Sequence, residues 1–433
     1  MSEFSRLPSV DALAQELSPE FPALSHGRLV EAIREAQAEA RRGEVPVEEV
    51  AARVRSRLNS LLSPSLRKVI NATGVVLHTN LGRAPLAAFT PIPGYQNLEY
   101  NLAEGRRGKR DEHLSPLLEA LLGAPAIVVN NNAAATFLVL RALAENSEVL
   151  VSRGELVEIG DGFRIPDIMS ESGAVLREVG ATNKTRLDDY RKGATERTRL
   201  LMRVHTSNFH VSGFTGKPSL QELSGLAREM QLPLYEDLGS GCLADLRTYG
   251  VQEPLVQESL AAGVDVVSFS TDKLLGGPQS GIIAGRADLI ARIRKHPMYR
   301  AFRVDKLTIQ ALDANLRALW SGNYAAIPSL RMIATPLDRL KARSEALREA
   351  LGFGEVSLGE SVLGGGSTPD QSVPTWLFSI PGQGTRLEKL LRANNPPVVA
   401  RIEKSALILD LRTVEAEDDE TILAALKRYA RST

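Results

Sequence analysis

The sequence predicts an α/β protein with a mostly parallel central sheet, a small helical N-terminal domain and a small α+β C-terminal domain. Residues 1–65 carry apolar side chains at helical spacing, and from Val69 short apolar runs alternate with amphipathic segments of helical length. That alternation is typical of a parallel sheet covered by helices on both faces. We therefore divide the 433 residues into domains at 1–65, 66–325 and 326–433.

The N-terminal domain is predicted to hold three helices. Ser9 can cap a helix over residues 10–18, and Ser25 can cap one that continues to Arg42. A third helix follows Pro46. The basic residues of this domain gather between residues 41 and 68, although the domain as a whole is neutral. A solvated helix face and a binding face explain this cluster equally well.

The middle domain is predicted to contain seven strands. They are expected at residues 126–130, 148–152, 174–179, 199–205, 232–237, 264–270 and 281–285. Helices fit between most of them, for example at 218–231. Ligands of such sheets bind at the carboxyl ends of the strands, where this sequence places a ring of polar residues.

The C-terminal domain is expected to begin with a helix that reaches Arg348, followed by a glycine-rich loop over 364–370. Strands near 375–380, 398–402 and 406–411 and a terminal helix complete it.

The composition is that of an ordinary soluble globular protein, which favours a cytoplasmic location. Lys+Arg and Asp+Glu are equal at 52 each, so net charge indicates neither a nucleic acid nor a membrane as partner. The charged N-terminus lacks the apolar run of a signal peptide, and no stretch approaches the length of a membrane span. Cys242 is the single cysteine, which excludes an intrachain disulfide and fits a reducing compartment.

Lys273 is the first candidate for chemistry, because it follows the apolar run of the 264–270 strand and precedes a Gly-Gly-Pro corner. Burial lowers the pKa of a lysine and makes its amine nucleophilic enough to bind an aldehyde cofactor such as pyridoxal phosphate (PLP). The alternative is a strand-end lysine that reaches solvent, which is commoner for a lone lysine.

PLP also needs a carboxylate at its ring nitrogen, a phosphate cradle and a group against its ring. Asp237, at a strand end, can supply the carboxylate. The phosphate can bind where a strand runs into a helix through small residues, and a hydroxyl near the lysine can add to that cradle. A histidine at a strand end can stack on the ring, although a satisfied strand-end histidine is as good an interpretation. The remaining cofactor candidates are Asn131, Asn132, Ala133, His205 and Ser270.

Other chemistries fit less well. Ser270-x-x-Lys273 matches the first motif of the serine β-lactamases, but their other motifs do not follow. Residues 215–219 (TGKPS) lack the first glycine of a P-loop. The histidines show no metal-ligand spacing with cysteine, so no metal is expected.

Several motifs together resemble the bacterial selenocysteine synthase family, whose members are fold-type-I PLP enzymes that transfer selenium to L-seryl-tRNA(Sec). The similarity covers nearly the whole chain and is dense from Val69 to about Thr308. The motifs are SFSTDKLLGGPQSGII, NATGVVLHTNLGRAPL, VVNNNAAA, VSRGELVEIGDGFRIPDIM, VHTSNF, DLGSG and HPMYRAFRVDKLT.

The resemblance implies that the chain converts L-seryl-tRNA(Sec) to L-selenocysteyl-tRNA(Sec) with selenophosphate, through an aminoacrylyl-tRNA. It implies that the N-terminal domain recognises tRNA(Sec), and that the chain forms a homodecamer built as a pentamer of dimers. It also implies that Lys273 is the PLP lysine, that Asp272 is a further catalytic candidate, and that three arginines hold the donor's phosphate group. These arginines are Arg83, Arg300 and Arg303.

Two other functions stay open. One is a PLP-dependent lyase or transferase acting on a small amino acid, with the N-terminal helices serving assembly alone. The other is a tRNA-binding or scaffold protein with a vestigial site.

Three prolines distinguish this chain from the family that it resembles, because members usually have a fuller helix after the position of Arg83. These prolines are Pro85, Pro91 and Pro93.

Overall fold

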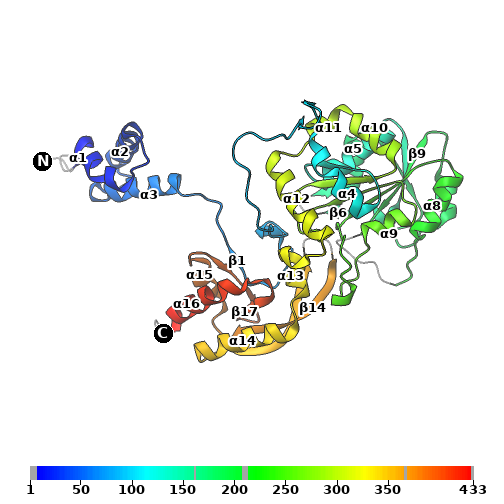
Figure 1. Cartoon of the computed structure of the whole chain (residues 1–433). Coiled ribbons are helices and arrows are strands. Elements are labelled where there is room, and N and C mark those ends of the chain that lie inside the picture. The colour runs from blue at the N-terminus through cyan, green and yellow to red at the C-terminus, as the bar shows by residue number, and fades with distance from the viewer. Residues whose placement is uncertain (1–6, 160–161, 207–212, 365–367, 431–433) are drawn as a thin grey trace. The chain divides into compact units, whose positions relative to one another are not determined.

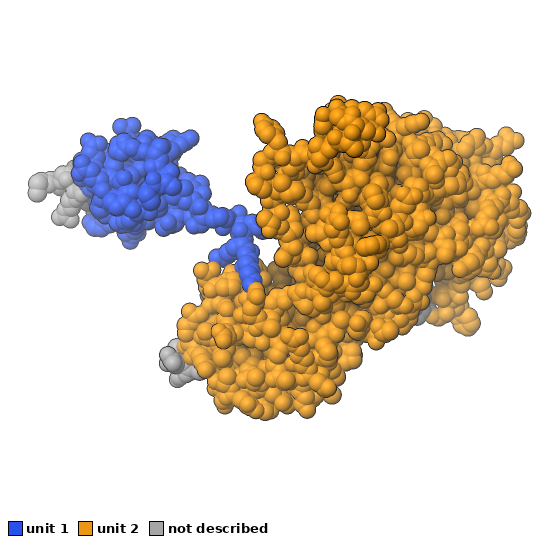
Figure 2. All heavy atoms as spheres, in the orientation of Figure 1, with its two compact units in different colours: residues 1–68 blue, residues 69–433 orange. Residues whose placement is uncertain are grey.

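The computed structural model describes residues 7–159, 162–206, 213–364 and 368–430 (Figure 1). The chain divides into two compact units, residues 1–68 and residues 69–433 (Figure 2). The finer division at residues 65 and 325 stays a prediction. None of the helices in the described part of the chain is both long and apolar enough to cross a membrane.

The first unit is a cluster of three helices, as the apolar spacing predicts. Its core includes Leu17, Ile33 and Val54, which are fully buried. Ser9 caps the first helix, because its Oγ accepts a hydrogen bond from the amide of Ala12 at 3.1 Å. The helices are α1 (Val10–Leu17), α2 (His26–Arg41) and α3 (Val50–Leu62).

The arginines of α3 are paired within the same unit. Glu39 forms ion pairs with Arg53 at 2.7 Å and with Arg57 at 3.2 Å. Arg55 forms an ion pair with Glu20 at 2.8 Å. Exposed pairs of this kind contribute about 0–1 kcal/mol each to stability. Their main effect here is that carboxylates neutralise part of the positive charge predicted between residues 41 and 68.

The second unit contains a seven-stranded sheet in the order β4-β12-β11-β10-β9-β5-β8. All seven predicted strands are present. β12 is antiparallel to both of its neighbours and the other pairs are parallel, which confirms the mostly parallel sheet. The strands are β4 (Ala126–Val129), β5 (Glu148–Ser152), β8 (Val175–Val179), β9 (Thr198–Val204), β10 (Leu234–Gly239), β11 (Val266–Ser270) and β12 (Gly281–Gly285).

Helices cover both faces of this sheet, because its strands are apolar on both sides. In β4, Ile127 and Val129 face one core and Val128 faces the other. The first core is formed with α5 (Asn132–Ala144), α6 (Ile165–Glu171), α10 (Ala287–Lys295) and α11 (Pro297–Ala301). The second is formed with α4 (Ser115–Leu122), α7 (Leu187–Gly193), α8 (Leu220–Glu229), α9 (Val256–Ala261) and α12 (Lys306–Trp320).

The C-terminal part of the second unit is an antiparallel sheet in the order β13-β14-β17-β16, packed against helices. The predicted loop over 364–370 is partly wrong, since Gly364 ends one strand and residues 368–370 begin the next; residues 365–367 lie outside the described residues. Its elements are α13 (Pro328–Ala334), α14 (Leu337–Leu351), β13 (Glu355–Gly364), β14 (Thr368–Ile380), α15 (Gly384–Arg392), β15 (Val398–Val399), β16 (Arg401–Glu403), β17 (Ala406–Asp410) and α16 (Asp419–Ala430).

The chain enters the second unit through this C-terminal part rather than through the central sheet. β1 (Ile70–Asn71) pairs in parallel with β15, and Ile70 is buried in the C-terminal core. Residues 84–99, which include the three prolines, contain no helix or strand. Four short strands complete the unit: β2 (Tyr100–Asn101) pairs with β3 (Arg106–Arg107), and β6 (Glu158–Ile159) pairs with β7 (Phe163–Arg164).

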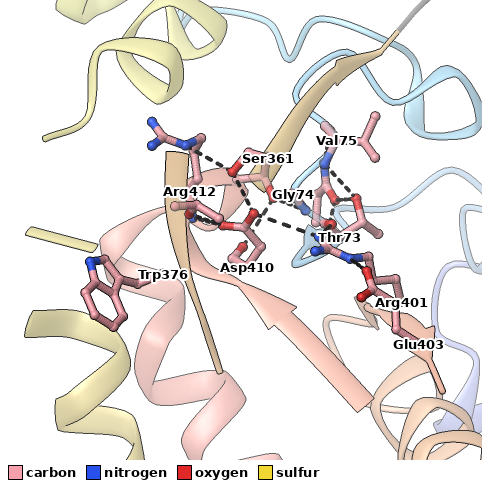
Figure 3. A network of polar contacts seen from close by, with 12 residues as sticks. Thr73, Gly74, Val75, Ser361, Trp376, Arg401, Glu403, Asp410 and Arg412 are labelled. Atoms are coloured by element: carbon pink, nitrogen blue, oxygen red, sulfur yellow. Dashed lines mark hydrogen bonds and ion pairs between the residues drawn. The ribbon is translucent and has the colours of Figure 1, made fainter. Parts of the chain in front are cut away.

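A buried polar network fastens this entering segment to β17 (Figure 3). Asp410 is fully buried and accepts hydrogen bonds from the hydroxyls of Ser361 at 2.6 Å and Thr375 at 2.9 Å. The amide of Gly74 donates to the hydroxyl of Thr413 at 3.1 Å. The segment that leads to Arg83 is therefore held by the C-terminal sheet.

Gly74 is predicted to tolerate no side chain. Its φ is +78°, and a Cβ there would lie 2.2 Å from Oδ2 of Asp410. We expect Gly74→Ala to lower the free energy of unfolding by about 2 kcal/mol or more, because it combines left-handed strain with disruption of a buried carboxylate. Urea unfolding measures this change. Gly225→Ala in α8, where nothing lies within 4 Å, is the control and should leave stability equal or higher.

Candidate active site

Lys273 lies in a buried turn directly after β11, at the carboxyl edge of the central sheet. Its side chain is 5% exposed, so the alternative of a lysine that reaches solvent is wrong for this protein. The amide of Thr271 donates to the carbonyl of Ser280 at 3.0 Å, and that of Leu274 donates to the carbonyl of Ser240 at 3.1 Å. The turn is therefore fixed on both sides of the lysine.

Burial lowers the pKa of Lys273, and the neighbouring guanidinium of Arg83 lowers it further. The carboxylates of Asp272 and Asp237 act in the opposite direction. An amine with a lowered pKa is available as a nucleophile or a base closer to neutral pH than an exposed lysine.

Asp237 is held in one orientation by α5. Its Oδ1 accepts a hydrogen bond from Nδ2 of Asn132 at 2.8 Å, and its Oδ2 accepts one from Oγ1 of Thr136 at 2.8 Å. Tyr235 donates to Thr136 in turn at 3.0 Å. Burial raises the pKa of Asp237, while the bonds from Asn132 and Thr136 lower it. A cation placed beside this carboxylate would favour its charged form.

The start of α5 offers backbone donors beside Asp237. Asn131 caps the helix through its own side chain, which accepts from the amide of Ala134 at 2.8 Å. Oδ1 of Asn132 is buried and has no hydrogen-bond partner among the described residues. The first turn of this 13-residue helix, including Ala133, is partly exposed, so its amides can receive an anion.

His205 and Ser270 lie at the ends of the strands that flank β10. The amide of His205 donates to the carbonyl of Asp237 at 2.9 Å, and its ring Nε2 lies 3.3 Å from Oε1 of Glu253. Ser270 is the last residue of β11 and is buried. Both residues are at the predicted edge of the sheet. Ser270 precedes Lys273 by three residues, and the strand that leads to His205 is a neighbour of the strand that carries Asp237.

Arg83 is joined directly to the lysine turn. Its Nη1 lies 2.8 Å from Oδ2 of Asp272, and the amide of Ala84 donates to the carbonyl of Asp272 at 3.1 Å. The φ of Arg83 is +63°, a left-handed conformation that costs a non-glycine residue free energy. The surrounding contacts hold Arg83 in this conformation.

We expect Arg83→Met to raise the pKa of Lys273. The guanidinium lowers this pKa, and its loss would also leave the carboxylate of Asp272, which raises the pKa, without its partner. In the variant, reaction of the Lys273 amine with an aldehyde should therefore require a higher pH. A pH titration of the visible absorbance after addition of PLP measures the midpoint. An unchanged or lower midpoint would refute the effect of Arg83 on the pKa of Lys273. The control is Arg286→Met, which breaks the ion pair of Arg286 with Asp265.

Arg300 and Arg303 belong to a different group of contacts. They line a cavity of about 660 Å³, in which Nη1 of Arg303 lies 2.9 Å from Oε1 of Glu99. The contacts of the described residues thus join Arg83 to Asp272 and Arg303 to Glu99. They do not join the three arginines into one cluster within this chain.

Sequence reasoning missed three residues that the structure adds to these groups. Thr136 follows Asn132 by four residues, so its place on the same helix face could have been inferred. Glu99 and Glu253 carry no such signal, because each comes from a segment without regular periodicity and meets its partner through the tertiary fold.

The sequence of the chain is similar to those of a known protein family. Residues 69–415 match the family model described as "SelA: L-seryl-tRNA selenium transferase". The protein named L-seryl-tRNA(Sec) selenium transferase from Geobacter sulfurreducens is 44% identical, over 99% of this chain and 100% of its own length. The protein of the same name from Carboxydothermus hydrogenoformans is 45% identical, over 98% of this chain and 97% of its own.

Among solved structures, a D-glucosaminate-6-phosphate ammonia-lyase aligns with a TM-score of 0.58. The alignment covers 87% of this chain and 98% of that one at 20% sequence identity, so it is evidence about the fold alone.

Proposed function

The chain belongs to the L-seryl-tRNA selenium transferase family, and we propose that it converts L-seryl-tRNA(Sec) to L-selenocysteyl-tRNA(Sec) with selenophosphate and PLP. The observation that carries this proposal is the buried Lys273, which lies inside the region that matches the family. Asp237 is one of the charged groups that act on the pKa of Lys273. The reaction exchanges the seryl oxygen for selenium and releases phosphate, so it needs neither an oxidant nor a reductant.

The residues around Lys273 fit PLP. Lys273 would bind the aldehyde carbon, and Asp237 would hold the ring nitrogen. The amides of the first turn of α5 would donate hydrogen bonds to the phosphate. Ser270 would add a hydroxyl and His205 would lie against the ring. When bound, PLP supplies an electron sink for the bond to Cα.

The chain's own groups would handle the protons and charges. The uncharged amine of Lys273 would take the proton from Cα of the seryl group and later return it. Asp272 and Arg83 would set the protonation of that amine, since they act on its pKa in opposite directions. The guanidiniums of Arg83, Arg300 and Arg303 would bind the donor's phosphate group through charge-assisted hydrogen bonds.

Within the described residues, Arg83 pairs with Asp272 and Arg303 with Glu99, and no ion pair links these two groups. We propose that the working form is a homo-oligomer, a decamer built from five dimers, and that residues 1–65 recognise the body of tRNA(Sec). The proposed location is the cytoplasm, where charged tRNA is used.

Substrate choice separates this function from the lyase or transferase that acts on a small amino acid. Purified protein with PLP and selenophosphate is given either seryl-tRNA(Sec) or free L-serine, and phosphate release is followed. We expect phosphate release with seryl-tRNA(Sec) and none with free L-serine. Turnover of free serine at a similar rate, with seryl-tRNA(Sec) inert, would support the alternative instead.

A further inference from the structure

The cavity that holds Arg300 and Arg303 is more basic than binding of one small dianion requires. Seven of its lining side chains are arginine or lysine, whereas two, Glu99 and Asp111, are acidic. Its volume of about 660 Å³ is in the range of pockets that hold drug-sized ligands, well above the size of selenophosphate. The cavity therefore has both space and charge left after a donor is bound.

The two carboxylates pair with four of the five lining arginines, and Arg300 has no such partner among the described residues. Glu99 lies 2.9 Å from Arg303 and 3.0 Å from Arg110. Asp111 lies 2.6 Å from Arg294. These pairs fix the arginine side chains and use up the negative charge of the lining.

Two lysines of the lining, Lys109 and Lys295, stay without such a partner. Both are exposed, and neither forms an ion pair with any residue in the described ranges. Lys295 ends α10, where a cation also interacts favourably with the helix dipole. That effect does not explain Lys109, which lies in a separate segment before α4 and faces the same cavity.

The cavity wall is attached to the predicted cofactor site. The amide of Asn130 donates to the carbonyl of Phe302 at 3.0 Å, and the ring of Phe302 meets that of Phe137 in α5 edge-on, with centroids 5.8 Å apart. Phe302 stands between the two cavity arginines in sequence, and Asn130 leads into α5. The segment that carries Arg300 and Arg303 is thus fixed to the strand end at which α5 begins.

We propose that Lys109 and Lys295 bind the phosphodiester groups of the single-stranded 3′ end of the aminoacyl-tRNA. This inference rests on the proposed function, because the seryl ester sits on that 3′ end and must reach Lys273. Exposed cations that follow an RNA backbone supply most of the affinity for a single strand, without a need for base contacts. Lysine suits this task, since its ammonium contacts a phosphate as a point charge.

The test compares binding of two RNA hairpins by fluorescence anisotropy: one ends in unpaired CCA-3′, and the other has the same stem with a blunt end. The proteins are the wild type, Lys109→Gln/Lys295→Gln, and a control with the same charge change on exposed helices, Lys389→Gln/Lys427→Gln. We expect the wild type and the control to prefer the CCA-ended hairpin by fivefold or more. The cavity variant should lose this preference. The slope of its log Kd plotted against log salt concentration should fall by about 1.4, which is about 0.7 for each of two lost phosphate contacts.

Equal binding of the two hairpins by the wild type, or an intact preference in the cavity variant, would overturn the inference. So would a raised KM for selenophosphate in the cavity variant with unchanged hairpin binding, because the lysines would then serve the donor. The hairpin assay needs no turnover. A failure of the wild type to transfer selenium would therefore refute the proposed function separately.

Discussion

Lys273→Ala is expected to abolish selenium transfer, with a fall in kcat of about 10³-fold or more. The variant loses the amine that would bind PLP and the base that would move the Cα proton, and proton transfer alone contributes about 10²–10⁴-fold in enzymes. The measurement is the rate of selenocysteyl-tRNA formation under saturating PLP. In parallel, borohydride reduction followed by mass spectrometry of the peptides locates the attached cofactor in the wild type.

A second lysine with a lowered pKa, Lys217, provides the control for this variant. Burial also lowers the pKa of Lys217, and Arg203 lowers it further. Lys217 lines a different pocket, together with Glu155 and Thr206, and is assigned no role in the site. Lys217→Met should keep the cofactor on Lys273 and retain turnover. Attachment of PLP to Lys217 in the wild type, or normal turnover by Lys273→Ala, would show that a lowered pKa was misread as function.

Asp237→Asn is expected to lower kcat by about 10²-fold or more and to weaken PLP binding. The substitution keeps the size of the side chain but removes the charge that would stabilise a protonated ring nitrogen, and loss of one preorganised electrostatic group typically costs 10²–10³-fold. Measurements of kcat at saturating PLP and of the Kd for PLP separate the two effects.

Thr136→Val tests whether the charge of Asp237, rather than its hydrogen bonds, carries this effect. It removes the donor to Oδ2 and leaves the carboxylate and Asn132 in place. A net hydrogen bond is worth about 1 kcal/mol, so activity should stay within about tenfold of the wild type. If Asp237→Asn loses no more than Thr136→Val, the electrostatic role assigned to Asp237 is incorrect.

Local sequence patterns were sufficient to predict the central sheet and the ends of its strands. The apolar runs that became β4 and β11 are short and buried on both faces, and their polar ends place Asn132 and Lys273 at one edge. The comparisons confirm the family resemblance and the fold class. The roles of individual site residues stay predictions.

Other features depend on contacts that no local pattern encodes. β13 was missed because glycine and exposed polar residues interrupt its apolar pattern, and it is stabilised by pairing with β14. The pairing of β1 with β15 needs a partner more than 300 residues away. The left-handed backbone of Arg83 likewise depends on its ties to Asp272, which are far from it in sequence.

The most direct test of the proposed function is a single-turnover reaction with tRNA(Sec) charged with ¹⁴C-serine, followed by hydrolysis of the ester and identification of the labelled amino acid. With selenophosphate and PLP, we expect the wild-type protein to yield labelled selenocysteine, and Lys273→Ala to return labelled serine. Labelled serine alone from the wild-type protein, or selenocysteine from Lys273→Ala, would contradict the proposal that this chain transfers selenium at Lys273.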